Sequence, residues 1–400
     1  MLIATIVVLT IPNSYSKCIV SKSIKYPQRF VSTMIDRFLG DIYEILAKHE
    51  EGNLIFSPLS LHAILTMVNL GASGKTSRQL SSSLRMSCDK NNAAEGYREL
   101  IYLLLNVEGV KLKFANKIFV SQTSVLKNSF GDKMTWFFKS DTSLIDSTRP
   151  EKAAEDINRW YAKETENHIK NLYEPSDIEN AKMLLANAIY FKGSWTNKFD
   201  TRYTQPYPFY VNGRKESSKN VPMMYIDAEF QWGYILGLKS GFIELPYGNQ
   251  TNPAIKMTII LPNLGVDIRD VERNISKLPT IKYSGSTSKV ALRLPKFKIE
   301  SEFDLKPILK EIGINDMFEN TANFQNMTEN SGMKVNKIVQ KVVIEVNEEG
   351  SEAAVASGMT MESREASPVF IVNRPFLVVI SMERLKWILF VGRVMDPTAV

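Results

Sequence analysis

The sequence predicts an α+β fold, with helices in the first third of the chain and sheets over most of the rest. Apolar residues recur at helical spacing in that first third, whereas later segments alternate apolar and polar residues or form short apolar runs. No internal repeat, low-complexity tract or linker rich in Pro, Gly or Ser divides the chain. We therefore expect one domain within residues 17–400, folded from about residue 25 to 397.

The first predicted helix carries a stripe of apolar residues at helical spacing, formed by Phe30, Met34, Phe38, Ile42, Ile45 and Leu46. A second helix begins at Ser57-Pro58, because a serine hydroxyl can cap the first turn and proline fits there without losing a hydrogen bond. Residues 92–105 and 152–169 also have helical patterns. The segment 71–76 lacks the spacing of a phosphate-binding loop, so we expect a turn between two helices there.

Later segments have the patterns of strands. Residues 112–120 and 292–299 alternate apolar and polar side chains, the second segment around a proline, as half-buried strands do. Residues 257–261 and 387–391 are continuous apolar runs, which suit strands buried on both faces. The segment 339–346 is strongly β-forming.

Residues 1–16 have the features of a secretory signal peptide. An apolar run too short to cross a membrane is followed by small residues around a plausible cleavage point at residue 16. A buried N-terminal strand is the alternative interpretation. We expect a secreted, extracellular protein, and the N-glycosylation sequons at Asn249, Asn274 and Asn326 fit that route.

The composition bounds the functional class. The net charge is +6, with 49 basic and 43 acidic residues interspersed, so contact with a polyanion is permitted but not required, and nothing indicates nucleic acid. Beyond the N-terminus no apolar stretch is long enough to span a membrane. Secretion permits a disulfide between Cys18 and Cys88, but a protein of this size does not need one, and we expect two free thiols.

Residues suited to catalysis or metal binding are scarce. The three histidines, His49, His62 and His168, lie in or beside helical patterns, where we expect surface or packing roles. No serine has the context of a nucleophile elbow, and no spacing of His, Cys and carboxylates suggests zinc. We expect neither an enzyme nor a bound cofactor or metal.

A hinge of mostly very small side chains follows the β-forming segment. It consists of Glu348, Gly350, Ser351, Glu352, Ala353, Ala354, Val355, Ala356 and Ser357. Small uncharged side chains can move between solvent and a crowded sheet at little cost, and Gly350 can absorb the change in backbone direction. We expect a loop that is exposed in one state and becomes a central strand in another.

Four separated motifs, in the family's order, resemble the serpins over nearly the whole chain after residue 16. They are the segments 53–60, 187–195, 373–376 and 390–397. The resemblance implies the serpin fold, in which N-terminal helices pack on a large central mixed β-sheet with two further sheets. It also implies an exposed reactive centre loop at about residues 348–372, and we expect a monomer.

The resemblance assigns roles to several residues. A polar cluster called the shutter, under the centre of the main sheet where strands part, matches Ser57, Ser60, Asn187 and Gln340. The breach, where the loop enters the sheet, matches Trp195, Lys296 and Glu348. Family members usually have histidine where this chain has Gln340. Alternation alone places the Gln340 amide in an apolar row, where it is either buried with hydrogen-bond partners or marks a solvated edge.

Inhibitory serpins act as suicide substrates. The resemblance implies that a serine protease attacks the loop, forms an acyl-enzyme and is trapped when the cut loop enters the main sheet. The family pattern places the scissile residue sixteen positions after Glu348, at Arg364, so that Glu365 follows the cut. Arginine there selects trypsin-like proteases. Cleavage at bond 362–363 or 365–366, or an arginine that only solubilises the loop, are the alternatives.

We therefore expect an irreversible inhibitor of an extracellular trypsin-like serine protease, by family analogy in a cascade such as clotting or innate immunity. A non-inhibitory carrier or chaperone is the alternative, although such relatives tend to have bulky or charged hinges. A heparin-like glycosaminoglycan is a candidate modulator, because basic residues cluster in sequence at Lys277, Lys282, Lys289, Arg293, Lys296 and Lys298.

Overall fold

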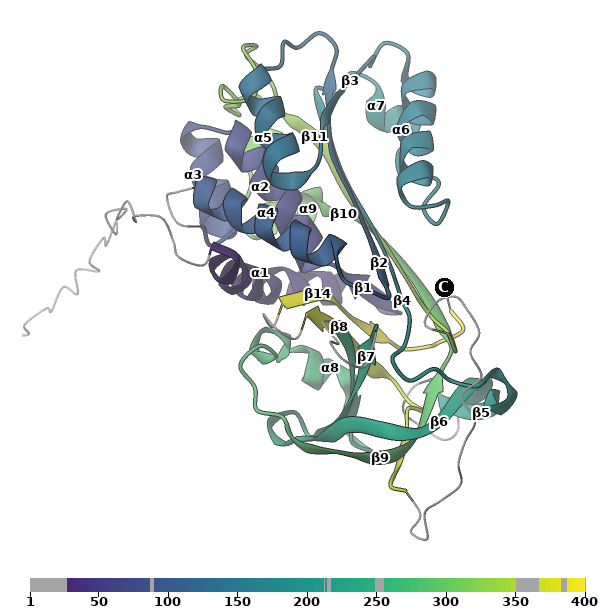
Figure 1. The fold of residues 1–400 in the computed structure, drawn as a ribbon. Coiled ribbons are helices and arrows are strands. Elements are labelled where there is room, and N and C mark those ends of the chain that lie inside the picture. Colours follow the sequence, from purple (N-terminus) through teal and green to yellow (C-terminus); the bar gives the residue numbers. More distant parts are fainter. Residues whose placement is uncertain are drawn as a thin grey trace, which may run out of the picture.

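The computed structural model describes residues 27–86, 90–211, 213, 217–248, 255–349, 367–382 and 387–399. The predicted signal peptide, both cysteines, Asn249, the hinge from Gly350 onward and the Arg364–Glu365 bond lie outside these residues. Within them the protein has two β-sheets, with helices on both sides of the five-stranded one (Figure 1). The predicted α+β class is confirmed.

The described α-helices are α1 (Pro27–His49), α2 (Pro58–Gly71), α3 (Gly74–Ser83), α4 (Lys90–Leu105), α5 (Asn128–Phe138), α6 (Pro150–Glu164), α7 (Pro175–Ile178), α8 (Ile268–Glu272) and α9 (Leu305–Glu311). The apolar stripe predicted on the first helix is the buried face of α1. Ser57 caps α2, where its Oγ accepts a hydrogen bond from Ser60 N at 3.3 Å. The predicted turn lies between the end of α2 and the start of α3.

The five-stranded sheet has the order β10-β11-β4-β2-β3. Its strands are β2 (Val110–Ser121), β3 (Thr142–Ile145), β4 (Met183–Gly193), β10 (Phe297–Asp304) and β11 (Val335–Val346). The pairs β11–β4 and β2–β3 are parallel, and the other two are antiparallel, so the sheet is mixed as expected. We call the parallel contact between β4 and β11, in the middle of this sheet, the seam.

The second sheet has nine strands. They are β1 (Leu54–Phe56), β5 (Gln205–Tyr210), β6 (Ser218–Ile235), β7 (Ser240–Tyr247), β8 (Ile255–Pro262), β9 (Ser284–Pro295), β12 (Val369–Ile371), β13 (Phe376–Met382) and β14 (Trp387–Val394). Two further sheets were expected from the resemblance. The 18-residue strand β6 pairs in turn with β5, β9 and β7, and so joins their strands into one continuous sheet.

Two predicted elements have different bounds. The segment 292–299 is not one strand, because β9 ends at Pro295 and β10 begins at Phe297 in the other sheet. Proline has no N–H to continue a ladder, which makes it a suitable corner residue. The predicted helix 152–169 ends at Glu164, because Glu166 and Asn167 take left-handed backbone conformations with φ of 53° and 65°.

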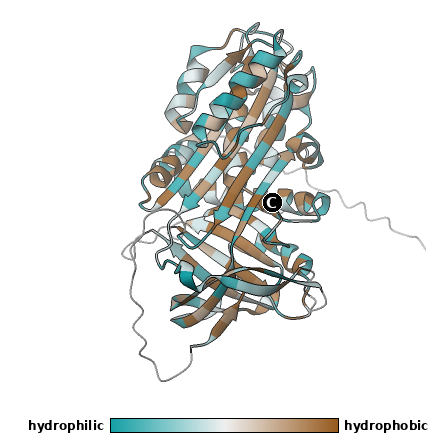
Figure 2. Cartoon of the chain, turned by 90° about the vertical axis from the view of Figure 1, so that its right-hand side faces the viewer, coloured by the Kyte–Doolittle hydropathy of each residue, from teal (hydrophilic) through white to brown (hydrophobic). Residues whose placement is uncertain are grey.

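Buried side chains form two clusters on opposite faces of the five-stranded sheet. The larger contains α1, α2, α4 and α5 with the nine-stranded sheet, and the smaller lies between α6 and strands β2, β4 and β11. Figure 2 shows hydrophobic residues, in brown, along the long strands between these layers. No helix among the described residues is both long and apolar enough to cross a membrane.

Candidate functional site

The predicted shutter residues lie together at the seam. Asn187 on β4 and Gln340 on β11 are directly paired, and the first turn of α2 brings Ser57 and Ser60 beneath them. All four side chains are fully buried, so Gln340 does not mark a solvated edge. The apolar row that contains Gln340 therefore faces α2, and the Gln340 amide must find its hydrogen-bond partners inside the protein.

Gln340 finds those partners on both sides of the seam. Its Oε1 accepts from Ser57 N at 3.2 Å, and its Nε2 donates to Ser57 O at 3.1 Å and to Asn187 Oδ1 at 2.5 Å. The Asn187 amide in turn donates to Ser60 Oγ at 2.7 Å. Ser57 Oγ donates to Leu389 O on β14 at 2.8 Å, which ties the cluster to the second sheet.

Asn116 on β2 is a fifth member of this cluster that the sequence interpretation missed. Its Oδ1 accepts from Ser60 Oγ at 3.1 Å and also from the Asn187 amide. The signal was available, because Asn116 stands in the apolar row of segment 112–120 just as Gln340 does in its own strand. The polar cluster therefore connects β2, β4 and β11 to α2 without any group that titrates near neutral pH.

The predicted breach residues meet where β11 ends. Lys296 Nζ lies 2.8 Å from Glu348 Oε2, and Thr204 Oγ1 donates to Glu348 Oε1 at 2.7 Å. Partial burial alone raises the pKa of Glu348, but the hydrogen bonds from Lys296 and Thr204 outweigh it, so the pKa lies below its usual value. No sequence signal had indicated Thr204.

Trp195 holds the backbone beside this ion pair. Its Nε1 donates to Asn347 O at 2.8 Å, and its ring stacks on Tyr247 with centroids 4.3 Å apart. A Cβ at Gly193 would lie 2.6 Å from the Tyr247 ring, which explains the glycine in the motif at the end of β4. The described chain stops beyond Glu349 beside this site and resumes at residue 367, just before β12 joins β9 in the other sheet.

The described sequons have engaged asparagine side chains. Asn274 Nδ2 donates to Asp270 O at 3.0 Å, and its Oδ1 accepts from Lys277 Nζ at 2.7 Å. Asn326 Nδ2 donates to Ala72 O at 3.0 Å, and Thr328 is buried. Glycosylation of these sites stays a prediction.

Most of the predicted basic cluster is paired within the protein. Lys289 lies 3.5 Å from Asp227, Lys296 is bound to Glu348, and Lys277 contacts Asn274. The Arg293 guanidinium lies over two tyrosine rings, at 5.2 and 4.9 Å from their centroids. These six residues therefore present fewer free cations than the sequence alone indicated.

Histidines do not form a catalytic arrangement in the described residues. His62 is fully buried, and burial lowers its pKa to about 4, so the ring is neutral. Its Nε2 donates to Leu84 O at 2.9 Å, and Tyr97 Oη lies 2.7 Å from its Nδ1. His168 stacks on Tyr190 with centroids 3.9 Å apart. Both histidines therefore have the packing roles expected of them. The described residues contain no group of three or more potential metal ligands.

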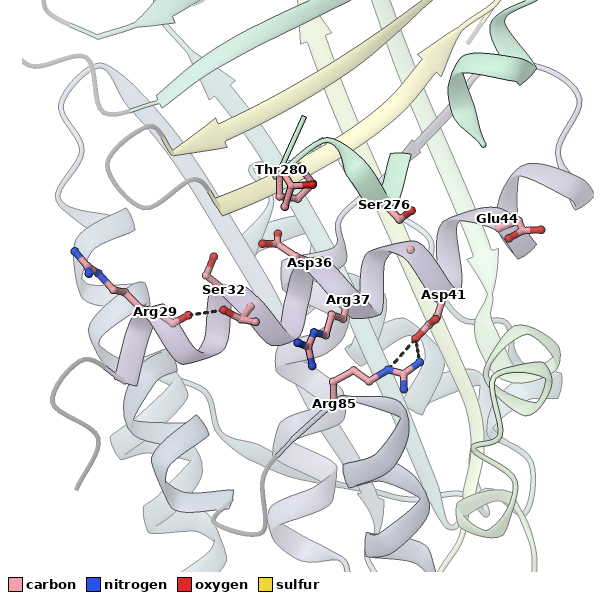
Figure 3. Close-up of a pocket in the computed structure, with 12 residues that line it drawn as sticks. Arg29, Ser32, Asp36, Arg37, Asp41, Glu44, Arg85, Ser276 and Thr280 are labelled. Atoms are coloured by element: carbon pink, nitrogen blue, oxygen red, sulfur yellow. Dashed lines mark hydrogen bonds and ion pairs between the residues drawn. The ribbon is translucent and has the colours of Figure 1, made fainter. Parts of the chain in front are cut away.

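A separate hollow of about 930 Å³ lies along α1, between that helix and residues 276–280 (Figure 3). Arg85 bridges to Asp41 at 2.6 Å on its lower side. Asp36 extends toward Thr280, and its Oδ1 is buried without a hydrogen-bond partner in the described residues. Burial raises the Asp36 pKa to about 7. The sequence interpretation gave no role to this residue.

Comparison with known proteins identifies the class of protein that this fold and site define. A family model described as serpin (serine protease inhibitor) matches residues 34–397. The chain therefore belongs to the serpin family, whose members are in general protease inhibitors.

Relatives of this chain include insect and mammalian proteins. "Serine protease inhibitor 42Dd" of Drosophila melanogaster is 36% identical, over 89% of this chain and 95% of the relative. Human neuroserpin is 33% identical, over 88% of each chain. Among solved structures, Serpin48 of the insect Tenebrio molitor superposes with a TM-score of 0.82 at 28% identity, covering 92% of this chain and 98% of that one. Native protease nexin-1, solved with heparin, has a TM-score of 0.80 at 28% identity, covering 93% and 99%.

Proposed function

We propose that this protein is an irreversible suicide-substrate inhibitor of an extracellular trypsin-like serine protease, cleaved between Arg364 and Glu365. The observation that carries the proposal is the seam. Strands β4 and β11 run parallel, in unbroken register from Lys337–Leu184 to Ile344–Phe191, and the hinge follows directly after β11. A strand that turns back from β11 and enters the seam runs antiparallel to both neighbours, which replaces a parallel ladder by two antiparallel ones.

The side chains on both sides of the seam fit such an insertion. The apolar cluster between these strands and α6 includes the small or aliphatic residues Ala186, Ala188 and Val343 besides Tyr190. Lys341, which alternates with Val343 on β11, is paired with Glu300 and Glu302. The hinge alternates Ser351, Ala353, Val355 and Ser357 on one face, and none of these is charged. Burial of that face therefore needs no desolvation of a charge.

The chemistry is that of an interrupted proteolysis. The serine hydroxyl of the protease attacks the Arg364 carbonyl carbon, an ester bond forms, and the peptide bond to Glu365 breaks with release of its amine. Loop insertion then moves the attached protease and distorts its active site, so that the ester is not hydrolysed. Glu362 and Glu365 flank the arginine, so we propose a target whose neighbouring subsites are basic.

The test is a gel with trypsin as probe. Mixing should give a band of summed mass that survives boiling in detergent, and sequencing of the released peptide should begin at Glu365. The Arg364→Ala variant should lose the band, and Ala353→Arg should be cleaved without forming it, because a charged hinge residue resists burial. Clipping of the unmodified protein without a complex would favour the carrier or chaperone alternative.

Secretion is part of the proposal and has its own test. The apolar run within residues 1–16 and the three sequons support it. Protein collected from the medium of expressing cells should begin at Lys17 and lose mass on treatment with an amidase that removes N-glycans. Retention inside the cell with residue 1 intact would contradict it.

Modulation by a sulfated polysaccharide is a second candidate, favoured by the relative solved with heparin. Because Lys289, Lys296 and Arg293 are already engaged within the protein, we propose at most weak retention on a heparin column at physiological salt. Strong retention that is lost in a Lys282→Ala, Lys298→Ala double variant would instead assign these two residues to a polysaccharide site.

A further inference from the structure

Two turns meet at one end of the nine-stranded sheet. The first is the short 3₁₀ helix η3 (Leu236–Leu238) between β6 and β7, and the second follows β8 and begins at Asn263. Asn263 N donates to Lys239 O at 2.9 Å, so the two turns lie side by side. The segment before β9 adjoins them, because a Cβ at Gly237 would lie 3.7 Å from Ile281 Cδ1. We call this end of the sheet the leucine corner, and its exposed residues are Tyr234, Leu236, Lys239, Leu264, Lys282 and Tyr283.

The two leucines are the most exposed apolar side chains of this corner. Leu236 is 80% exposed and Leu264 is 77% exposed, the two highest values for any large apolar residue among those described. Tyr234 is 55% exposed, because its ladder neighbours on β7 and β9 are Gly241 and Ser284, which are too small to cover the ring. Single leucines are ordinary on a protein surface, but two on adjoining turns beside a tyrosine form an apolar patch.

The backbone fixes both turns that carry the leucines. Lys239 N donates to Leu236 O at 3.2 Å, and Val266 N donates to Asn263 O at 3.0 Å. Lys239 and Gly265 take left-handed conformations, with φ of 48° and 82°. The closed turns hold the leucine side chains in water, which costs free energy unless another apolar surface covers them.

The unpaired charge at this corner is positive. Lys239 and Lys282 are exposed, and neither pairs with a carboxylate among the described residues. The acidic groups that follow the second turn are engaged. Asp267 Oδ1 accepts a backbone hydrogen bond at the start of α8 at 2.9 Å, and Asp270 forms an ion pair with the residue that follows this helix. An anionic surface would therefore meet two free cations beside the leucines.

Projecting leucines, a neighbouring tyrosine and free lysines match the layers of a membrane surface. Leucine side chains enter the acyl region, tyrosine rings lie at the level of the headgroups, and lysines contact anionic headgroups. A protein partner would need a hollow that fits two projecting turns, whereas a fluid lipid surface closes around them. The charges and the exposure of the leucines therefore favour lipid.

We propose that the leucine corner docks this protein reversibly on membranes that expose anionic phospholipid. The corner is separate from the base of the loop. Tyr234 lies eleven residues along β6 from Met223, or about 35 Å along the strand, and Met223 pairs with Pro295 next to Lys296. The inference goes beyond the proposed function and does not rest on it.

Flotation of the whole protein with lipid vesicles tests the proposal. Vesicles of phosphatidylserine and phosphatidylcholine in equal parts should bind the protein at low salt, and vesicles of phosphatidylcholine alone should bind less of it. The double variant Leu236→Ser, Leu264→Ser should bind the mixed vesicles at least about tenfold more weakly, because it loses the apolar contacts. The double variant Lys239→Gln, Lys282→Gln should also bind the mixed vesicles about tenfold more weakly, but should differ little from the unmodified protein on phosphatidylcholine alone.

The matched control is the double variant Leu144→Ser, Lys170→Gln. Leu144 is 54% exposed on the edge strand β3, and Lys170 is exposed beyond the end of α6, so this variant loses comparable side chains elsewhere on the surface. It should bind both kinds of vesicle as the unmodified protein does. Because every altered residue is exposed, the melting temperature of each variant should change little, which separates weaker binding from unfolding.

The outcomes decide between lipid docking and its alternatives. Absence of binding to the mixed vesicles overturns the proposal. Full binding by the leucine variant also overturns it, because adsorption then depends on charge alone, and so does an equal loss of binding in the control. Capture of a protein through the same leucines, without binding to vesicles, assigns the corner to a protein interface and overturns lipid docking. A protein that binds vesicles but forms no complex with trypsin keeps this site and loses only the proposed function.

Discussion

At the scale of single residues, the Gln340 amide is the part of the seam most sensitive to change. It is fully buried and bonds to the Ser57 backbone in both directions as well as to Asn187. Gln340→Ala leaves those partners unsatisfied, so we expect a loss of about 2–4 kcal/mol in stability. Thermal melting measures it, with Gln325→Ala as control, because Gln325 is an exposed residue with a single side-chain bond to Ser73 Oγ. Equal melting temperatures for the two variants would contradict the expectation.

Asp36 predicts a pH dependence of the opposite sign to that of a paired carboxylate. Its pKa in the folded protein is about 7, above the usual 3.8, because burial penalises the charged form. The folded state therefore binds a proton more tightly than the unfolded state, and the stability that this provides is present below pH 4 and lost as pH rises toward 7. Asp36→Asn removes the charge, so we expect it to stabilise the protein by about 1–3 kcal/mol at pH 8 and little at pH 4.

Melting temperatures of Asp36→Asn and the unmodified protein, measured from pH 4 to pH 8, provide the check. Asp41→Asn is the control, because that carboxylate is half exposed and already bound by Arg85. A gain from Asp36→Asn that is the same at every pH would contradict burial of the charge as its cause.

The sequence indicated four of the five members of the polar cluster, and the structure explains which could be found. Ser57, Ser60, Asn187 and Gln340 stand in motifs or in conspicuous apolar rows, and Asn116 has the same signature. Thr204 could not be found, because its contact with Glu348 joins residues 144 positions apart and nothing in the local pattern marks it.

At the scale of elements, Thr204 predicts how firmly the base of the loop is held. Glu348 has a lowered pKa, so its ionised form contributes stability that is present above pH 4.5 and is lost as pH falls below that value. Thr204→Val removes one hydrogen bond to this carboxylate and should cost about 1–2 kcal/mol at pH 7, with the difference vanishing on acidification. The melting temperature measured from pH 7 to pH 3 checks this, with Thr201→Val as the control on the same exposed turn.

The ends of helices and strands depend on contacts between distant residues, which the periodicity of the sequence does not reveal. Residues 292–299 alternate in a way that suits one strand, yet the chain changes sheets after Pro295. Lys296 pairs there with Glu348, and Phe297 begins a ladder with β11. The end of α6 was likewise invisible, since Glu166 and Asn167 take left-handed conformations that their residue types permit but do not require. Strand existence was thus easier to predict than strand partnership.

At the scale of the whole molecule, the sheet order is what turns a loop of small residues into a candidate for insertion. Composition and alternation predicted the α+β class and a movable hinge, but not that β11 has a parallel neighbour. The β11–β4 pair joins segments about 150 residues apart, so the local pattern of neither segment indicates its partner. The resemblance predicted a mixed central sheet that accepts the loop, and the observed parallel pairing of β11 with β4 gives that expectation a physical consequence.

That consequence is metastability, and it predicts the behaviour of the protein when its loop is cut. In the intact chain the seam is a single parallel ladder, whereas an inserted strand of about 14 residues would form two antiparallel ladders and bury an uncharged face. Limited cleavage within residues 358–366 should therefore raise the melting temperature by about 10 °C or more. Ala353→Arg, cut in the same way, should show no such rise, because the buried charge opposes insertion. An unchanged melting temperature after cleavage of the unmodified protein would mean that the seam does not accept a strand, since two added ladders must stabilise the cut protein.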